Sequence, residues 1–106
     1  MAIRSTRDLL LQIDDLKAAT AFYEEVLGLT VFMRSPLITG LEAGAFRLFL
    51  EEGAPLGPIP EFLVPDVATL RDRLVAAGCT VVEEDPAIPR CYIRDPFGLV
   101  FNLGTA

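Results

Sequence analysis

Apolar and polar residues follow two different spacings along this chain, and the change of spacing marks the predicted elements. Apolar runs at residues 9–13 and 62–64 are short, and Asp or Pro bounds them, as is typical of strands. Residues 16–27 repeat their apolar side chains at the three- and four-residue spacing of an amphipathic helix. Gly28 then ends this helix, because a residue without Cβ suits the left-handed conformation beyond a helix end.

A second copy of the same pattern follows. The stretch FLVPDVATLRDRLVAAGCTVV resembles LQIDDLKAATAFYEEVLGLTVF, with Asp66 in the place of Asp15 as the helix cap and Gly78 in the place of Gly28 as the stop. The first copy is one residue longer between cap and stop. After each helix the pattern predicts three strands, at residues 29–33, 37–39 and 45–50 in the first half and 80–83, 90–94 and 99–103 in the second. Each half therefore reads as β-α-β-β-β, and the Pro- and Gly-rich residues 52–60 read as the linker.

Length, composition and net charge limit the kind of protein this can be and the kinds of partner it can bind. The 106 residues fit one domain, 52% are hydrophobic and 23% charged, and no apolar run approaches the roughly 20 residues of a membrane helix. The opening MAIRSTRD shows no secretion signal, so we expect a cytoplasmic protein that binds no membrane. A net charge of −6 without a basic stripe argues against nucleic acid and favours a neutral or cationic ligand.

The chain contains no histidine, which removes the commonest metal ligand and the commonest acid or base near neutral pH. Cys79 and Cys91 have no CxxC spacing and read as small core residues. No nucleophile has a base to activate it, and no phosphate-binding loop is present, so hydrolysis and phosphoryl transfer are not predicted.

Three stretches together resemble the vicinal oxygen chelate superfamily, which contains glyoxalases, bleomycin resistance proteins and extradiol dioxygenases. They are IDDLKAATAFYEEVLGLTV, its second copy VPDVATLRDRLVAAGCTV, and the terminal DPFGLVFNL. The resemblance covers nearly the whole chain and implies a single α+β domain at residues 1–106. It would be built from two βαβββ modules, at about residues 1–52 and 60–106, whose curved mixed sheets form a cup completed in a homodimer.

The resemblance also indicates where metal-using members place their ligands. Here those positions hold Asp8, Ile59, Asn102, and either Phe49 or Glu51. Ile59 and Phe49 offer no lone pair and Asn102 is a weak neutral donor, whereas a catalytic divalent metal needs about three or more protein ligands. We therefore predict no metal and no cofactor, although an oxygen-only magnesium site completed by water stays open.

Strand alternation predicts which side chains face the cup. If Leu9, Leu11 and Ile13 pack under the helices, their neighbours in the strand face the other way. The predicted ligand-binding residues are Asp8, Gln12, Phe32, Arg47, Phe49, Glu51, Tyr92 and Asn102. The alternatives are structural. The aromatic residues could be core, the two carboxylates could be solvated strand ends or partners of Arg47 or Arg94, and the two amides could hydrogen-bond each other or the backbone across the sheet.

The leading functional hypothesis is a metal-independent binding protein, similar to bleomycin-resistance and other drug-sequestering members of the family. A homodimer would hold an aromatic or cationic small molecule, with Asp8 and Glu51 selecting positive charge, and no bond would be broken. One alternative is a metal-dependent lyase, isomerase or dioxygenase with unusual ligands. Another is a degenerate module kept for association with a partner chain.

Overall fold

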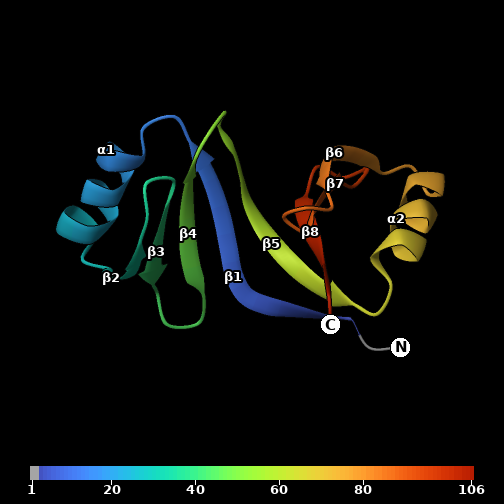
Figure 1. Ribbon diagram of the computed structural model, residues 1–106, viewed down its shortest axis with the longest axis horizontal. Helices are drawn as coiled ribbons and strands as arrows, with labels where there is room; N and C mark the ends of the chain where they lie inside the picture. Colours follow the sequence, from blue (N-terminus) through green and yellow to red (C-terminus); the bar gives the residue numbers. More distant parts are fainter. Residues whose placement is uncertain (1–2) are drawn as a thin grey trace. The chain divides into compact units, whose positions relative to one another are not determined.

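The structure is a computed structural model that describes residues 3–106. The chain folds into two compact units: residues 7–58, here the N-terminal unit, and residues 59–106 together with residues 3–6, here the C-terminal unit. Each unit contains a sheet with helix on one of its faces (Figure 1).

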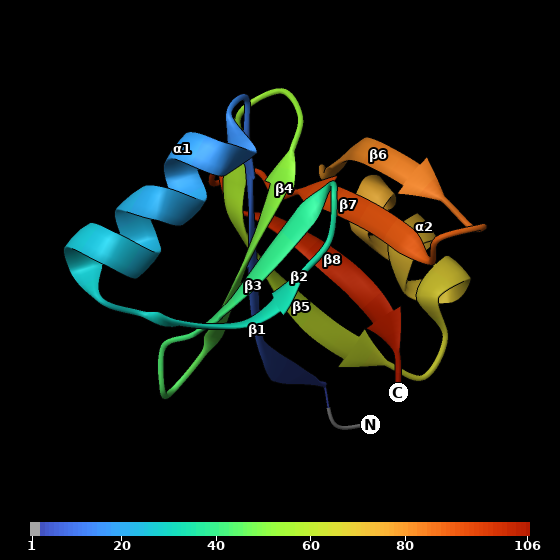
Figure 2. The same cartoon turned by 60° about the vertical axis from the view of Figure 1, so that its left-hand side comes forward.

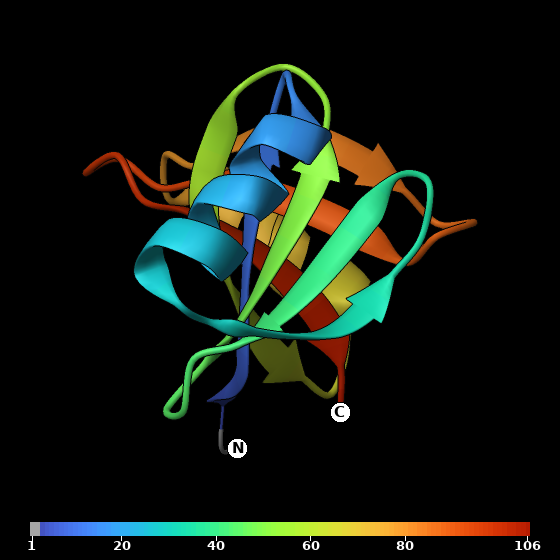
Figure 3. The same cartoon turned by 90° about the vertical axis from the view of Figure 1, so that its left-hand side faces the viewer.

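The N-terminal unit has its strands in the order β2-β3-β4-β1, with β1 parallel to β4 and the other neighbours antiparallel. Figure 2 shows the chain running from α1 through η1 into β2, and Figure 3 shows the unit from the side of α1, with the β2–β3 hairpin to the right of the helix. The elements are β1 (Arg4–Ile13), α1 (Leu16–Ala21), the π-helix η1 (Phe22–Leu27), β2 (Thr30–Arg34), β3 (Ile38–Glu42) and β4 (Arg47–Glu52).

The C-terminal unit repeats this arrangement with the order β5-β8-β7-β6, in which β5 is parallel to β8 and the other pairs are antiparallel. Its elements are β5 (Leu56–Val64), α2 (Val67–Ala76), β6 (Thr80–Asp85), β7 (Arg90–Arg94) and β8 (Val100–Thr105). The predicted α+β class, the two βαβββ modules and their mixed sheets are confirmed. The homodimer remains a prediction.

Helix and sheet in each unit enclose their own core, and the strand alternation is as predicted. Leu9, Leu11 and Ile13 pack with α1 against the buried Leu41, Leu48 and Leu50, so the side chains between them in β1 lie on the opposite face. In the C-terminal unit the core against α2 includes both cysteines, and burial raises the pKa of the Cys91 thiol. The prediction that both are small core residues is confirmed.

The first helix differs from the prediction in its second half, where residues 22–27 form a π-helix. The amide of Gly28 donates to the Tyr23 carbonyl at 3.1 Å, five residues earlier, and Gly28 has φ 92°. This helix spans one residue more between cap and stop than the second helix does, and a π turn takes up one extra residue without moving either end. The spacing of apolar residues predicts a helix, but it does not distinguish an α-helical turn from a π-helical turn.

The segment predicted as linker, residues 52–60, is strand over much of its length, because β5 already begins at Leu56. Pro58 and Pro60 fix an extended path, which a strand accepts, but they donate no backbone hydrogen bond. The register of β5 with β8 accordingly begins only at Glu61, opposite Asn102. Among residues 3–106, no helix is long and apolar enough to cross a membrane.

Candidate functional site

The face of the N-terminal sheet that lies opposite α1 gathers most of the predicted site residues. We call it the helix-free face. Strand register places Asp8 opposite Arg47, Gln12 opposite Glu51, and Phe49 between Leu10 and Gly40. The helix-free face is therefore made of Asp8, Leu10, Gln12, Phe32, Gly40, Glu42, Arg47, Phe49 and Glu51.

Phe32 lies on this face by strand alternation, because the preceding Val31 packs in the core on the α1 side. The β2–β3 register shifts between Val31 and Met33, so Met33 is the residue paired with Gly40. The ring lies over Gly40, where an added Cβ would come within 2.7 Å of Phe32 Cζ. Phe32 also meets Phe49 edge-to-face, with ring centroids 5.7 Å apart, and 45% of Phe32 stays exposed. The face thus presents an accessible aromatic pair.

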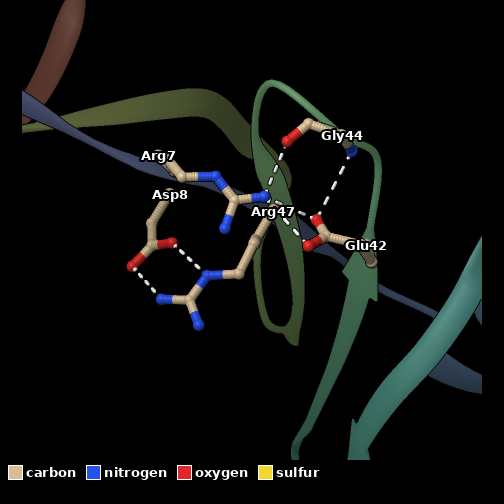
Figure 4. A network of polar contacts seen from close by, with 5 residues as sticks. All are labelled: Arg7, Asp8, Glu42, Gly44 and Arg47. Atoms are coloured by element: carbon tan, nitrogen blue, oxygen red, sulfur yellow. Dashed lines mark hydrogen bonds and ion pairs between the residues drawn. The ribbon is translucent and has the colours of Figure 1, made fainter.

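Arg47 lies beside both rings and is held by Asp8. Its Nε donates to Asp8 Oδ1 at 2.8 Å and its Nη2 to Oδ2 at 3.0 Å, so the pair is bidentate (Figure 4). Its Cζ is 5.4 Å from the ring centroids of Phe32 and Phe49, within the range of cation–π attraction. The hydrogen bond from Arg47 to Asp8 raises the pKa of Arg47 further above its ordinary value, which keeps the guanidinium charged.

A second ion pair borders the first at the β3–β4 turn. Arg7 Nη2 donates to the two carboxylate oxygens of Glu42 at 2.9 and 2.8 Å and to the Gly44 carbonyl at 2.6 Å (Figure 4). The hydrogen bond from Arg7 lowers the pKa of Glu42 below its ordinary value of 4.5. The sequence analysis missed this pair, because alternation separates Arg7 from Asp8 and gives no sign that the turn brings Glu42 within its reach.

The amide of Gln12 is also engaged within the face. Gln12 Nε2 donates to Glu51 Oε1 at 2.9 Å, across the β1–β4 register. Gln12 thus bonds the Glu51 side chain and not Asn102 or the backbone, which were its predicted structural partners, whereas the ion pair with Arg47 considered for Asp8 is present. Both side chains lie on the helix-free face.

The remaining predicted site residues, Tyr92 and Asn102, belong to the C-terminal unit. They are register partners in β7 and β8. Tyr92 is 2% exposed, with the Arg90 guanidinium 4.8 Å from its ring centroid. Asn102 Nδ2 donates to Glu61 Oε2 at 2.9 Å, and its Oδ1 accepts from the backbone amide of Cys91 at 2.8 Å.

Glu61 is a polar neighbour of Asn102 that the sequence analysis did not single out. It lies in β5 opposite Asn102, two positions after Ile59 and hence on the same face of the strand. This period of two, counted from Ile59, is the sequence signal for Glu61, and a linker at residues 52–60 hides it because a linker has no strand alternation. The Glu61 carboxylate accepts a hydrogen bond from the Asn102 side-chain amide.

The residues at the family's metal positions do not fit a catalytic divalent ion. Both oxygens of Asp8 bond to Arg47, Ile59 is apolar and 2% exposed, and Asn102 contributes an amide. At the fourth position Phe49 is aromatic, and the alternative Glu51 is a single carboxylate that accepts a hydrogen bond from Gln12. Across residues 3–106 no group of three or more His, Cys, Asp or Glu side chains could hold a metal ion. The donor set is short of both charge and ligands for such an ion.

The fold and this face define an α+β protein of two βαβββ modules with an aromatic and polar surface on one sheet. Residues 7–103 match the model of the family described as the Glyoxalase/Bleomycin resistance protein/Dioxygenase superfamily, and the chain belongs to it. No curated protein matches the chain.

Solved structures share this fold at low sequence identity. A hypothetical protein from Bacillus halodurans C-125 is 14% identical with a TM-score of 0.67, covering 100% of this chain and 96% of its own. A glyoxalase/bleomycin resistance protein/dioxygenase superfamily member from Vibrio splendidus 12B01 is 23% identical with a TM-score of 0.61, covering 96% and 97%. A variant of homoprotocatechuate 2,3-dioxygenase from B.fuscum is 22% identical with a TM-score of 0.66, but the match covers 97% of this chain and only 32% of that enzyme.

Proposed function

We propose that this protein binds a small aromatic molecule without a metal ion and without breaking a bond. The observation that carries the proposal is the cluster of Phe32, Phe49 and Arg47 on the helix-free face, where Phe32 remains 45% exposed. Small-molecule sites are lined mainly by hydrophobic and aromatic side chains with a few placed polar groups, and this cluster supplies both kinds. The site is proposed to include the other predicted residues of this face. Tyr92 and Asn102, which lie in the C-terminal unit, stay predicted ligand-binding residues of that unit.

The energy of such binding would come mainly from apolar burial. Removal of apolar ligand and protein surface from water contributes about 25 cal/mol per Å2, and an edge-to-face or stacked aromatic contact adds about 0.5–1.5 kcal/mol. The Phe32 ring already rests on Gly40 and against Phe49, so binding needs little ordering of this side chain.

Charge recognition by Asp8 and Glu51, which the composition favours, receives less support than aromatic recognition. Asp8 is neutralised by a bidentate Arg47, and Glu51 accepts a hydrogen bond from Gln12. Family membership is consistent with drug sequestration of the bleomycin-resistance kind, which we keep as part of the proposal together with the homodimer and the cytoplasmic location.

Isothermal titration calorimetry with a panel of planar aromatic drugs and probes tests the proposal. Phe49→Ala and Phe32→Leu should each weaken binding by about tenfold, because each removes aromatic contact area. Phe22→Leu is the matched control, since Phe22 is also exposed and edge-to-face with a neighbouring ring but lies on the helix. Equal affinity of the wild type and both site variants for every binding compound would refute the site assignment.

Elemental analysis of dialysed, untagged protein separates this proposal from the metal-dependent enzyme. We expect no stoichiometric transition metal, and unchanged ligand affinity after treatment with a chelator, because the donor set described for residues 3–106 offers too few ligands. A stoichiometric metal whose removal abolishes ligand binding would favour the lyase, isomerase or dioxygenase reading instead.

A further inference from the structure

We infer that the preferred ligand carries a neutral oxygen acceptor conjugated to its aromatic ring, as in an aryl ketone or a quinone, and that Arg47 Nη1 binds this oxygen. The inference rests on the proposed function and names the class of ligand for the same face. Of the neutral and cationic ligands that the acidic composition favours, it selects the neutral kind.

The hydrogen-bond donors of Arg47 are only partly used. A guanidinium has five N–H groups. The Asp8 carboxylate engages Nε and Nη2, while Nη1 has no hydrogen-bond partner among residues 3–106. The Arg47 side chain is 38% exposed, so Nη1 can meet a ligand. Figure 4 shows this nitrogen on the side of the guanidinium away from Asp8.

Arg47 is also held in place before any ligand arrives. The two hydrogen bonds to Asp8 fix the plane of the guanidinium, and Phe32 and Phe49 flank it at 5.4 Å from each centroid. Phe32 is 45% exposed and its ring centroid lies 5.4 Å from Arg47 Cζ, so we expect a ligand ring stacked on Phe32 to bring an oxygen at its edge within reach of Nη1. A donor oriented in advance binds an acceptor with less entropic cost than a mobile side chain.

The charges of the face favour a neutral acceptor over either kind of ion. Asp8 compensates Arg47, and Glu42 compensates Arg7, so the two ion pairs together carry no net charge. A ligand cation would approach the Arg47 guanidinium, which repels it, and a ligand anion would lie near Asp8, Glu42 and Glu51. A ketone oxygen accepts a charge-assisted hydrogen bond without adding charge.

Matched compounds on one tricyclic skeleton test the inference. Fluorenone carries the neutral oxygen, fluorene lacks it, fluorenylammonium carries a cation and fluorenecarboxylate an anion. We expect equilibrium dialysis to show fluorenone binding about tenfold or more tightly than each of the others. Arg47→Lys should reduce the preference for fluorenone over fluorene to about twofold or less, because an ammonium lacks the planar fork. Arg34→Lys is the matched control, since Arg34 pairs with both oxygens of Glu24 on the helix and should leave the preference unchanged.

The outcomes separate the two proposals. Equal binding of fluorene and fluorenone, or tighter binding of fluorenylammonium, overturns the inference but leaves aromatic binding standing. A fluorenone preference that survives in Arg47→Lys also overturns it, because another donor then supplies the selectivity. Binding by none of the four compounds at their solubility limits refutes the inference, whereas the proposed function fails only if the wider calorimetric panel is also negative.

Discussion

The buried hydroxyl pair between α1 and β3 offers a sharp test of how the N-terminal unit is held together. Thr20 Oγ1 and Thr39 Oγ1 lie 2.9 Å apart, and the residues are 7% and 4% exposed. Replacing one threonine by valine keeps the shape and removes one partner, which leaves the other hydroxyl buried without its hydrogen bond. Replacing both removes the polar groups together.

The expected magnitudes follow from this difference. A buried polar group left without a partner costs about 1–3 kcal/mol, whereas loss of both partners to isosteric apolar groups is close to neutral. Thr20→Val and Thr39→Val should therefore each lower the free energy of unfolding by about 1–2 kcal/mol, and the double variant by about 1 kcal/mol or less. In a chain of this size, about 1 kcal/mol shifts the melting temperature by roughly 4 °C or more.

Urea denaturation of the wild type, the two single variants and the double variant completes the cycle. Circular dichroism reports the unfolding, and equal m-values across the four proteins show that the same surface is exposed. Single effects that add within about 0.5 kcal/mol in the double variant would refute the reasoning. Such additivity would mean that water satisfies either hydroxyl and that the contact contributes no coupling.

Further predictions concern a helix cap, an ion pair and a close contact. Asp66→Ala should lower the free energy of unfolding by about 1 kcal/mol, because Asp66 caps α2, and Asp66→Asn by much less; thermal denaturation checks both. The pKa of Glu42 is lowered, so the stability from its pair with Arg7 is fully present above about pH 4.5 and is lost as the pH falls through the lowered value. In a carbon-detected NMR titration Arg7→Gln should return the Glu42 pKa toward 4.5, and an unchanged pKa would contradict the assigned cause. Gly40→Ala should displace the Phe32 ring and weaken aromatic binding several-fold while the fold remains intact, as calorimetry and circular dichroism would show; unaltered affinity would exclude the ring from the site.

The sequence by itself determined the repeated βαβββ order and the face on which most of the site residues lie. Helix spacing and strand alternation are local properties, set by 3.6 residues per turn and by a period of two. Asp8, Arg47 and Phe49 could therefore be assigned to one face, opposite Leu9 and Leu11, from the order of residues alone.

Only the tertiary structure decided what those side chains do on that face. The choice of Arg47 as the partner of Asp8 depends on the β1–β4 register, and the contact between Phe32 and Gly40 depends on the pairing of β2 with β3. No local pattern specifies either. The π-helix and the pairing of Glu61 with Asn102 were likewise hidden, because the first depends on how one extra residue is accommodated and the second on two strands distant in sequence. Hydrogen bonds of this kind join residues that only folding brings together. The site predicted from Asp8 as acidic is therefore ion-paired in the structure, and Arg47 keeps hydrogen-bond donors that Asp8 does not use.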